Sequence, residues 1–450
     1  MEHIAIKGEN RLNGTVSMGG AKNAAVAILP ASVASGGVCV IDNLPHIEDV
    51  INLVKAMESM GAVCTFKDNN TLVVDSSNIT GHTLDDDLTK STRASYYFMG
   101  ALLGRFGHAE VPLPGGCDLG QRPIDYHLKG FAALGAECVQ EHGVVKLHAE
   151  KLRGANIYLD SPSVGATINI MIAAVFAEGI TLIENAAKEP HVVDAASFLN
   201  KLGAKVSGAG TATIRITGVP ALKGGEYTVI PDPIETGTYM IAAAITKGDV
   251  TVSNIIPKHM ESLSSKLREM GCNIEEGGDW IRVQGTEILK PCEVKTAVYP
   301  GFPTDLQPQM AVLLCRANGT SMITENIFEH RFRYTSELKR LGASLKVEGR
   351  TAITKGNCTF TGANVEATDL RAGAALVLAG LAAKGETIIG ELSHLDRGYE
   401  QFEEKFRSIG ADIRRIDIPE KRNILRESEN ASLVGDSHLE NLSLLGHSND

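Results

Sequence analysis

The stretch from Pro112 to Pro123 combines a single thiol with a backbone suited to a closing loop. It contains three prolines, three glycines, Cys117 and, five residues further on, Arg122. Glycines let a backbone fold back on itself and prolines stiffen its ends, so we expect a loop that closes over a site. Cys117 is then either a reactive thiol near a cation or a small residue without a chemical role, as most free cysteines are.

Polar and charged residues recur where apolar helices are expected to start. They are Lys22 and Asn23, Arg93, Ser163 to Gly165, Glu235 and Thr236, Thr304 and Asp305, and Asp369 to Arg371. The first turn of a helix offers unpaired N–H groups and a partial positive charge, so it attracts anions. For Asn23, Asp305 and Asp369 the structural alternative is an ordinary helix cap. If two domains face each other with these helix ends, one cleft collects all of these side chains.

These helices belong to a unit that recurs six times along the chain. Each copy has an apolar helix ending in Gly, a β-rich run, an amphipathic helix, a second Gly turn and further strands. The second turn has the form Leu-Gly-Ala or a close variant. Its glycines lie 68 to 74 residues apart, at Gly61, Gly135, Gly203, Gly271, Gly342 and Gly410.

The repeat predicts an α/β protein of two domains with three units each. A helix that is apolar nearly all round, such as 372–383, must be enclosed, and the units are longer than the 20–45 residues usual in solenoids. We expect a first domain at 22–229, which carries the Cys117 loop, and a second domain formed by 1–21 and 230–418. Residues 419–450 are polar and aperiodic, which indicates a disordered tail.

Composition excludes several classes of function. The net charge of −11 argues against binding nucleic acid, which needs a basic face. None of the eight cysteines forms a CxxC pair, so neither a zinc site nor thioredoxin chemistry is indicated, and we expect no metal or cofactor. The charged N-terminus is not a signal peptide and the apolar runs are too short for membrane insertion. We expect a cytoplasmic protein with free thiols, monomeric or weakly homo-oligomeric.

A set of motifs resembles the UDP-N-acetylglucosamine 1-carboxyvinyltransferases, enolpyruvyl transferases of the EPSP synthase-like superfamily. The resemblance spans about residues 1–416 and is carried by Gly20-Ala21-Lys22-Asn23-Ala24-Ala25, Pro114-Gly115-Gly116-Cys117 with Arg122-Pro123, Ser163-Val164-Gly165-Ala166-Thr167, Pro303-Thr304-Asp305-Leu306-Gln307, Ala367-Thr368-Asp369-Leu370-Arg371-Ala372 and Leu395-Asp396-Arg397-Gly398-Tyr399. The related shikimate-pathway synthase shares the fold but differs around the Cys117 loop.

The resemblance implies a fold and a reaction. The fold is a two-domain inside-out α/β barrel with six βαβαββ-like units, three per domain. The reaction transfers the enolpyruvyl group of phosphoenolpyruvate to the 3′-hydroxyl of UDP-N-acetylglucosamine by addition and elimination through a tetrahedral ketal, and releases phosphate. It is the first committed step of peptidoglycan synthesis, and both substrates are small molecules.

The resemblance also implies roles for individual residues. The catalytic set is Cys117, Asp305, Lys22 and Arg397: Cys117 is the general acid that protonates C3, and Asp305 contacts the sugar and is its base. The thiol also forms an adduct with phosphoenolpyruvate and reacts with epoxides of the fosfomycin type. The residues implied to bind phosphoenolpyruvate are Lys22, Asn23, Arg122, Arg371 and Arg397.

The implied contacts to UDP-N-acetylglucosamine form a larger group. They are Asn23, Arg93, Arg122, Pro123, Ile124, Asp125, Tyr126, Ser163, Val164, Gly165, Asp305 and Ile327, with Asp369 orienting the cations. For Ile327 the alternative is plain packing. Two positions depart from the family pattern: Gly19 stands where a serine is common, and Ser161-Pro162 where some members carry a lysine.

Two other functions stay open at this point. A paralogue could transfer enolpyruvate to another acceptor, and the region from Arg122 to Tyr126 would distinguish it. A catalytically silent repeat scaffold would have lost the cysteine or the arginines, and this chain retains Cys117, Arg122, Arg371 and Arg397.

Overall fold

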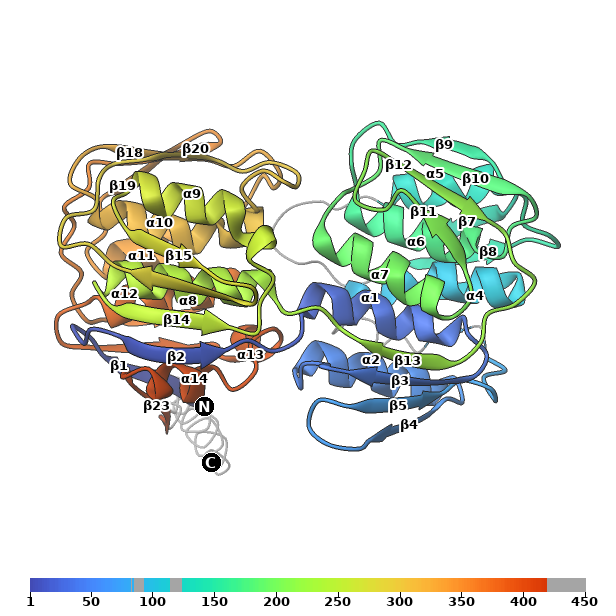
Figure 1. The fold of residues 1–450 in the computed structure, drawn as a ribbon, viewed down its shortest axis with the longest axis horizontal. Coiled ribbons are helices and arrows are strands. Elements are labelled where there is room, and N and C mark those ends of the chain that lie inside the picture. The colour runs from blue at the N-terminus through green and yellow to red at the C-terminus, as the bar shows by residue number, and fades with distance from the viewer. Residues whose placement is uncertain (82, 85–92, 114–123, 419–450) are drawn as a thin grey trace, which may run out of the picture.

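The chain forms two lobes that lie side by side, and two adjacent stretches connect them (Figure 1). The computed structural model describes residues 1–81, 83–84, 93–113 and 124–418. The connecting stretches are hydrogen-bonded to each other: the N–H of Ala21 donates to the carbonyl of Ile230 at 2.7 Å, and that of Asp232 to the carbonyl of Gly19 at 3.0 Å. Cys117, Arg122 and Pro123 lie outside the described residues, as does the predicted tail at 419–450.

The described residues of the first lobe form three separate sheets. One has the order β13 (Gly225–Thr228), β3 (Val38–Asp42), β5 (Leu72–Asp75) and β4 (Val63–Phe66). Another has the order β6 (His108–Pro112), β8 (Val144–His148) and β7 (Glu137–Glu141). The last has the order β11 (Lys205–Ser207), β12 (Thr213–Thr217), β10 (Ile180–Glu184) and β9 (Asn156–Tyr158).

The second lobe also has three sheets among the described residues. Their orders are β21 (Asn364–Glu366), β22 (Glu386–Gly390), β1 (Glu2–Lys7) and β23 (Asp412–Asp417); β15 (Asn273–Glu276), β16 (Trp280–Gln284), β14 (Asp249–Ser253) and β2 (Asn13–Ser17); and β17 (Glu293–Lys295), β18 (Ser321–Thr324), β20 (Thr351–Thr354) and β19 (Leu345–Glu348). The first two strands of the chain, β1 and β2, therefore pair within the second lobe, β2 in parallel with β14.

The predicted unit is seen most clearly from Asn156 to Thr217. Its order is β9, α6 (Val164–Ala174), β10, α7 (Pro190–Lys201), β11 and β12, and all four strands share one sheet. The short parallel strand β9 pairs with β10, which pairs in turn with the antiparallel strand β12. The α/β fold class and the βαβαββ unit, three to a lobe, are confirmed.

The helices divide into inner and outer sets. The inner helices are α1 (Lys22–Val33), α4 (Phe98–Phe106) and α6 in the first lobe, and α8 (Pro233–Ile245), α10 (Gln307–Arg316) and α12 (Leu370–Leu381) in the second. The outer α-helices are α2 (Glu48–Ser59), α5 (Asp125–Ala133), α7, α9 (Glu261–Glu269), α11 (Thr335–Arg340), α13 (Ser393–Asp396) and α14 (Phe402–Ser408). Short 3-10 turns are η1 (Arg93–Tyr97), η2 (Pro257–Met260) and η3 (Thr304–Leu306).

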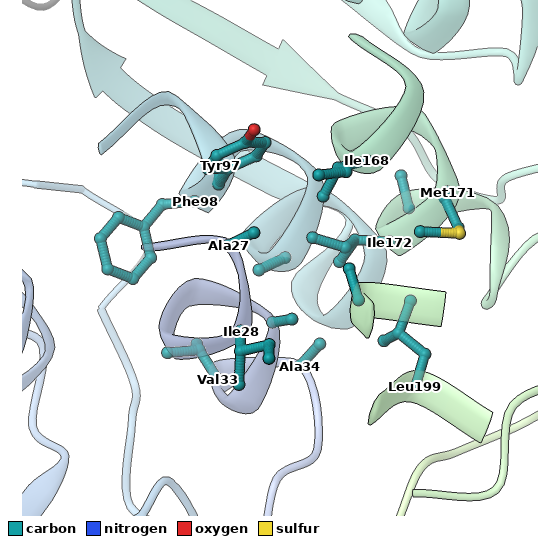
Figure 2. Close-up of a cluster of buried hydrophobic side chains, with 14 of the residues drawn as sticks. Ala27, Ile28, Val33, Ala34, Tyr97, Phe98, Ile168, Met171, Ile172 and Leu199 are labelled. Carbon is teal, nitrogen blue, oxygen red and sulfur yellow. The ribbon is translucent and has the colours of Figure 1, made fainter. Parts of the chain in front are cut away.

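Apolar side chains of the inner helices meet in the centre of each lobe. In the first lobe Ile28 of α1, Phe98 of α4 and Ile172 of α6 are fully buried, and Leu199 of α7 closes the cluster (Figure 2). Such helices expose no polar face to water, which explains why their sequences are apolar nearly all round. The surrounding side chains enclose the inner helices, so the first turns of these helices have fixed positions.

The six glycines of the repeat all end outer helices in the left-handed region. Their φ angles lie between +94° at Gly135 and +105° at Gly203. A residue with a Cβ is strained there, whereas Gly is not, so the turn from outer helix to strand requires Gly in every copy.

Two hydrophobic cores follow from this arrangement. One gathers buried residues from Ala21 to Val229. The other gathers buried residues from Ile4 to Met18 and from Ile234 to Ile413. These cores support the proposed division into domains at 22–229 and at 1–21 with 230–418.

A buried carboxyl in α7 predicts a dependence of stability on pH. Asp194 accepts hydrogen bonds from the hydroxyl of Tyr227 and from the N–H of Ile230, and burial raises its pKa from 3.8 to about 6. The folded state therefore holds the proton of Asp194 more tightly than the unfolded state does. The resulting contribution to stability is complete below the unfolded pKa and is lost as pH rises through about 6. The free energy of unfolding of Asp194→Asn, relative to that of wild type, should therefore rise by about 2 kcal/mol between pH 4 and pH 7.

Urea unfolding midpoints of both proteins across this pH range would measure the difference. Asp249→Asn provides a control at a partly exposed carboxylate, whose pKa of about 2 lies below the range tested. Parallel curves for wild type and Asp194→Asn would show that Asp194 does not titrate in this window.

Candidate active site

Asp305 binds side chains from both lobes. It lies in η3, directly before α10, and its carboxylate accepts hydrogen bonds from Nη2 of Arg331 and Nη2 of Arg371, each at 3.0 Å. From the first lobe, Nδ2 of Asn23 donates to the same carboxylate at 3.4 Å. The residue that caps η3 is Pro303, so the interpretation of Asp305 as a helix cap is wrong. The structure brings Asp305, Asn23 and Arg371 together, as the sequence predicts.

The charges around Asp305 favour an additional anion. Burial raises the pKa of Asp305, but Arg371 and Arg331 lower it by more, so the pKa lies well below its usual range and the carboxylate is ionised. One negative charge thus faces two guanidinium groups, whose side chains are 2% and 4% exposed. Nε of Arg331 and Nη1 of Arg371 are buried and have no hydrogen-bond partner among the described residues. Unsatisfied buried donors on cations are what an anionic ligand would complete.

A second carboxylate, Asp49, joins cations from the two lobes. Its oxygens lie 2.8 Å from Nζ of Lys22 and 2.9 Å from Nε of Arg397. Burial raises the pKa of Asp49, and Lys22 and Arg397 lower it by more, so this carboxylate is also ionised. Lys22 and Arg397 were both expected to bind phosphate, and the structure places them on one carboxylate. Lys22 is adjacent in sequence to Asn23, which reaches Asp305.

Helix starts bring these residues together. The backbone N–H of Lys22 at the start of α1 donates to Asp232, which also caps α8 through the N–H groups of Ile234 and Glu235. Asp369 caps α12 by accepting from the N–H groups of Arg371 and Ala372. The starts of α1, α8, α10 and α12 therefore converge, as expected. Asp369 is a cap, and it fixes Arg371 through the backbone.

The start of α6 packs closely against Tyr96 and His127 within the first lobe. Ser163 caps α6, and its hydroxyl accepts from the N–H of Ala166 at 3.3 Å. A Cβ at Gly165 would lie 3.0 Å from the hydroxyl oxygen of Tyr96 and 3.1 Å from the ring of His127, so Gly permits this approach. Asn169 holds both neighbours, because its Nδ2 donates to the carbonyl of Tyr96 at 2.7 Å and lies 3.0 Å from Nδ1 of His127.

The remaining predicted nucleotide contacts lie at the starts of α5, α6 and η1 and in the loop that follows β18. Ile124 precedes α5, Asp125 and Tyr126 form its first turn, and Val164 begins α6. Ile327 donates its N–H to Glu325 at 2.7 Å, and 37% of the residue is exposed. Arg93 begins η1. Among the described residues, the hydrogen-bond partners of Asp305 are Asn23, Arg331 and Arg371, and they include none of these remaining contacts.

Sequence reasoning did not select Asp49, Arg331, Asp232 or His191. Asp49 looks like the ordinary acidic first turn of an amphipathic helix, and Arg331 is one of several charged residues in Glu329-His330-Arg331-Phe332-Arg333. His191 lies near Asp305 and Asp232. Burial lowers its pKa by more than the nearby carboxylates raise it, so the imidazole is neutral. Among the described residues there is no helix long and apolar enough to cross a membrane, and no cluster of three metal-binding side chains.

The fold and the site define an enolpyruvyl transferase of the EPSP synthase type. The family model described as EPSP synthase (3-phosphoshikimate 1-carboxyvinyltransferase) matches residues 6–406. Among solved structures, the enolpyruvyl transferase NikO from Streptomyces tendae superposes with a TM-score of 0.85 and 28% identity over 93% of this chain and 99% of that chain. An EPSP synthase from Acinetobacter baumannii, at 19% identity and a TM-score of 0.73, over 93% of this chain and all of that one, supports the fold alone.

Curated relatives narrow this class. UDP-N-acetylglucosamine 1-carboxyvinyltransferase 2 of Clostridium acetobutylicum is 55% identical over 93% of this chain and all of its own length. The protein of the same name from Bacillus subtilis is 53% identical over 92% of this chain and 96% of its own. The chain therefore belongs to the UDP-N-acetylglucosamine 1-carboxyvinyltransferase family, and the resemblance seen in its motifs is confirmed.

Proposed function

We propose that the protein transfers the enolpyruvyl group of phosphoenolpyruvate to the 3′-hydroxyl of UDP-N-acetylglucosamine and releases phosphate, the first committed step of peptidoglycan synthesis. The observation that carries this proposal is the meeting of four cations from two lobes, Lys22, Arg331, Arg371 and Arg397, around Asp305 and Asp49. Phosphoenolpyruvate carries a phosphate and a carboxylate, and fixed arginine forks suit both groups.

The reaction places separate demands on the site. In the addition step, the sugar oxygen bonds to C2 of phosphoenolpyruvate, C3 gains a proton, and the hydroxyl loses one. In the elimination step, the C2–O bond to phosphate breaks and C3 loses a proton. We assign protonation of C3 to Cys117, which lies outside the described residues, and charge stabilisation of the phosphate to Lys22, Arg122 and Arg397.

Asp305 is the acceptor assigned to the sugar hydroxyl. An ionised carboxylate with a very low pKa is a weak base, because the proton it would gain is poorly held. Arg371 and Arg331 cause that low pKa. When the substrate anion engages these guanidinium groups, their field at Asp305 weakens and its pKa rises towards the range in which it can take the proton.

The sugar nucleotide is assigned to the first lobe and to the rim of the second. The residues proposed are Asn23, Arg93, Arg122, Pro123, Ile124, Asp125, Tyr126, Ser163, Val164, Gly165, Asp305 and Ile327. The packed start of α6 supports this assignment, because its N–H groups suit a diphosphate. We propose that the protein works in the cytoplasm as a monomer or weak homo-oligomer, without nucleic acid or membrane insertion.

Phosphate release tests the proposed function directly. Wild type mixed with phosphoenolpyruvate and UDP-N-acetylglucosamine should release one phosphate per enolpyruvyl sugar nucleotide, identified by mass. Without the sugar nucleotide, continuous release should be absent, because the addition step lacks its nucleophile. Shikimate 3-phosphate serves as the alternative acceptor. Faster turnover with it, or no turnover with UDP-N-acetylglucosamine, would contradict the proposal.

A further inference from the structure

Asp49 is the point at which the phosphate-binding cations of the two lobes meet. It lies in the first turn of α2, with 4% of its side chain exposed. One of its oxygens is 2.8 Å from Nζ of Lys22, a residue of the same lobe. The other accepts from Nε of Arg397, which follows α13 in the second lobe, at 2.9 Å. The proposed reaction gives Lys22 and Arg397 a role and gives Asp49 none.

Geometry indicates that this carboxylate orients both cations. A hydrogen bond to Nε fixes the plane of a guanidinium group, and the direction of that plane decides whether the fork meets an oxyanion. Lys22 is held at its other end too, because its backbone N–H donates to Asp232 at 2.9 Å. The side chain of Lys22 is only 14% exposed, so little water is available to replace Asp49 as its partner.

Lys22 and Arg397 need a carboxylate between them if both are to bind the same phosphate. Two cations held close together repel each other, and this repulsion is strong where water is scarce. The negative charge of Asp49 offsets this repulsion and leaves one net positive charge on the group Lys22–Asp49–Arg397. The cations can then stay close enough to bind one phosphate.

We propose that Asp49 is a positioning residue for the reaction: it aligns Lys22 and Arg397 across the lobe boundary so that both bind the phosphate of phosphoenolpyruvate. This inference rests on the proposed function. Asp49 acts through the two cations and does not itself touch the substrate.

The chain offers a matched control at the same boundary. Glu400 of the second lobe accepts hydrogen bonds from the N–H of His46 at 3.0 Å and from Nδ2 of Asn70 at 2.8 Å, both in the first lobe. It therefore joins the lobes as Asp49 does, but through neutral donors. A loss of kcat/KM in the Asp49 variant but not in the Glu400 variant would reflect misaligned cations. A loss of kcat/KM in both variants would reflect weaker contact between the lobes.

Steady-state kinetics of Asp49→Asn provide the main test. The variant should raise KM for phosphoenolpyruvate at least tenfold and lower kcat/KM about 100-fold, because the cations lose their alignment. The Kd of UDP-N-acetylglucosamine should stay within about twofold, since its proposed site does not involve Asp49. Asp49→Glu keeps the charge and should recover part of the loss. Glu400→Gln should keep kcat/KM within about twofold of wild type.

A double-mutant cycle tests whether Asp49 acts through Arg397. Arg397→Lys keeps the charge but has no guanidinium group, so the bond from Nε that fixes the plane of the fork is already absent. Adding Asp49→Asn to it should lower kcat/KM clearly less than the same change does in wild type, because only the alignment of Lys22 is left to lose. Additive losses would overturn the action through Arg397.

Other results would overturn the inference without affecting the proposed function. Tighter binding of phosphoenolpyruvate by Asp49→Asn would show that Asp49 competes with the substrate for Lys22 and Arg397. Equal losses in Asp49→Asn and Glu400→Gln would make it a general contact between lobes. If wild type instead released no phosphate, the proposed function would fail. Calorimetric binding of inorganic phosphate to wild type and Asp49→Asn would still measure the alignment, because it needs no turnover, and equal affinities would overturn the inference.

Discussion

Asp305→Asn should reduce kcat about 1000-fold and destabilise the protein by about 3 kcal/mol. The two oxygens of Asp305 have different partners, Arg331 on one and Arg371 on the other. An asparagine side chain has one oxygen and one amide donor, so one arginine would face a donor and lose its partner. The negative charge that balances both buried cations disappears as well, and with it the group assigned to receive the hydroxyl proton.

Phosphate release, UDP-N-acetylglucosamine binding and the urea unfolding midpoint should be measured for the same preparation. Asp249→Asn is the control, because Asp249 also pairs with an arginine, Arg282, but at the surface of β14. It should leave turnover unchanged. A value of kcat for Asp305→Asn within tenfold of wild type would show that Asp305 neither organises the cations nor accepts the proton.

The fold could be predicted because its signals are local. Each copy of the repeat has its own Gly turn, and a left-handed Gly such as Gly203 can be recognised from its neighbours alone. Helix caps are equally local, which is why the cap alternative for Asp369 was visible in the sequence and is observed. The pairing of β1 and β2 with the second lobe is not local, and the sequence indicated only that residues 1–21 belong to the second domain.

The candidate site was predicted less completely because its contacts are distant in sequence. Arg397 and Asp49 are 348 residues apart, and no pattern around Asp49 distinguishes it from the acidic first turn of any surface helix. Arg331 was missed for the same reason, since its partner Asp305 lies 26 residues earlier in another element. Motifs identified both members of the pair Asp305–Arg371, but only one member of each pair that involves Arg331 or Asp49, and only the folded chain shows the other.

The largest effect is expected for Cys117. In Cys117→Ser a hydroxyl replaces the thiol, and because a hydroxyl is a far weaker acid, turnover should fall at least 1000-fold. Cys117→Asp should keep measurable activity, because a carboxylic acid can still hold and deliver a proton to C3. The same variant should resist an epoxide of the fosfomycin type, since the thiolate that opens the ring is absent. Phosphate release with and without the epoxide measures all three effects.

The other cysteines provide the control for this prediction. Seven of them are described by the structure, all as free thiols, and burial raises the pKa of Cys39, Cys64 and Cys272, which makes these thiols poor nucleophiles. Cys358 differs, because a hydrogen bond with Cys315 lowers its pKa to about 6, but only 7% of the residue is exposed, so the inhibitor has little access to it. Peptide mass mapping of treated wild type should therefore find one inhibitor mass, on the peptide that contains Cys117. Full activity of Cys117→Ser would remove the thiol from the mechanism, and labelling of another cysteine would show that the epoxide acts elsewhere.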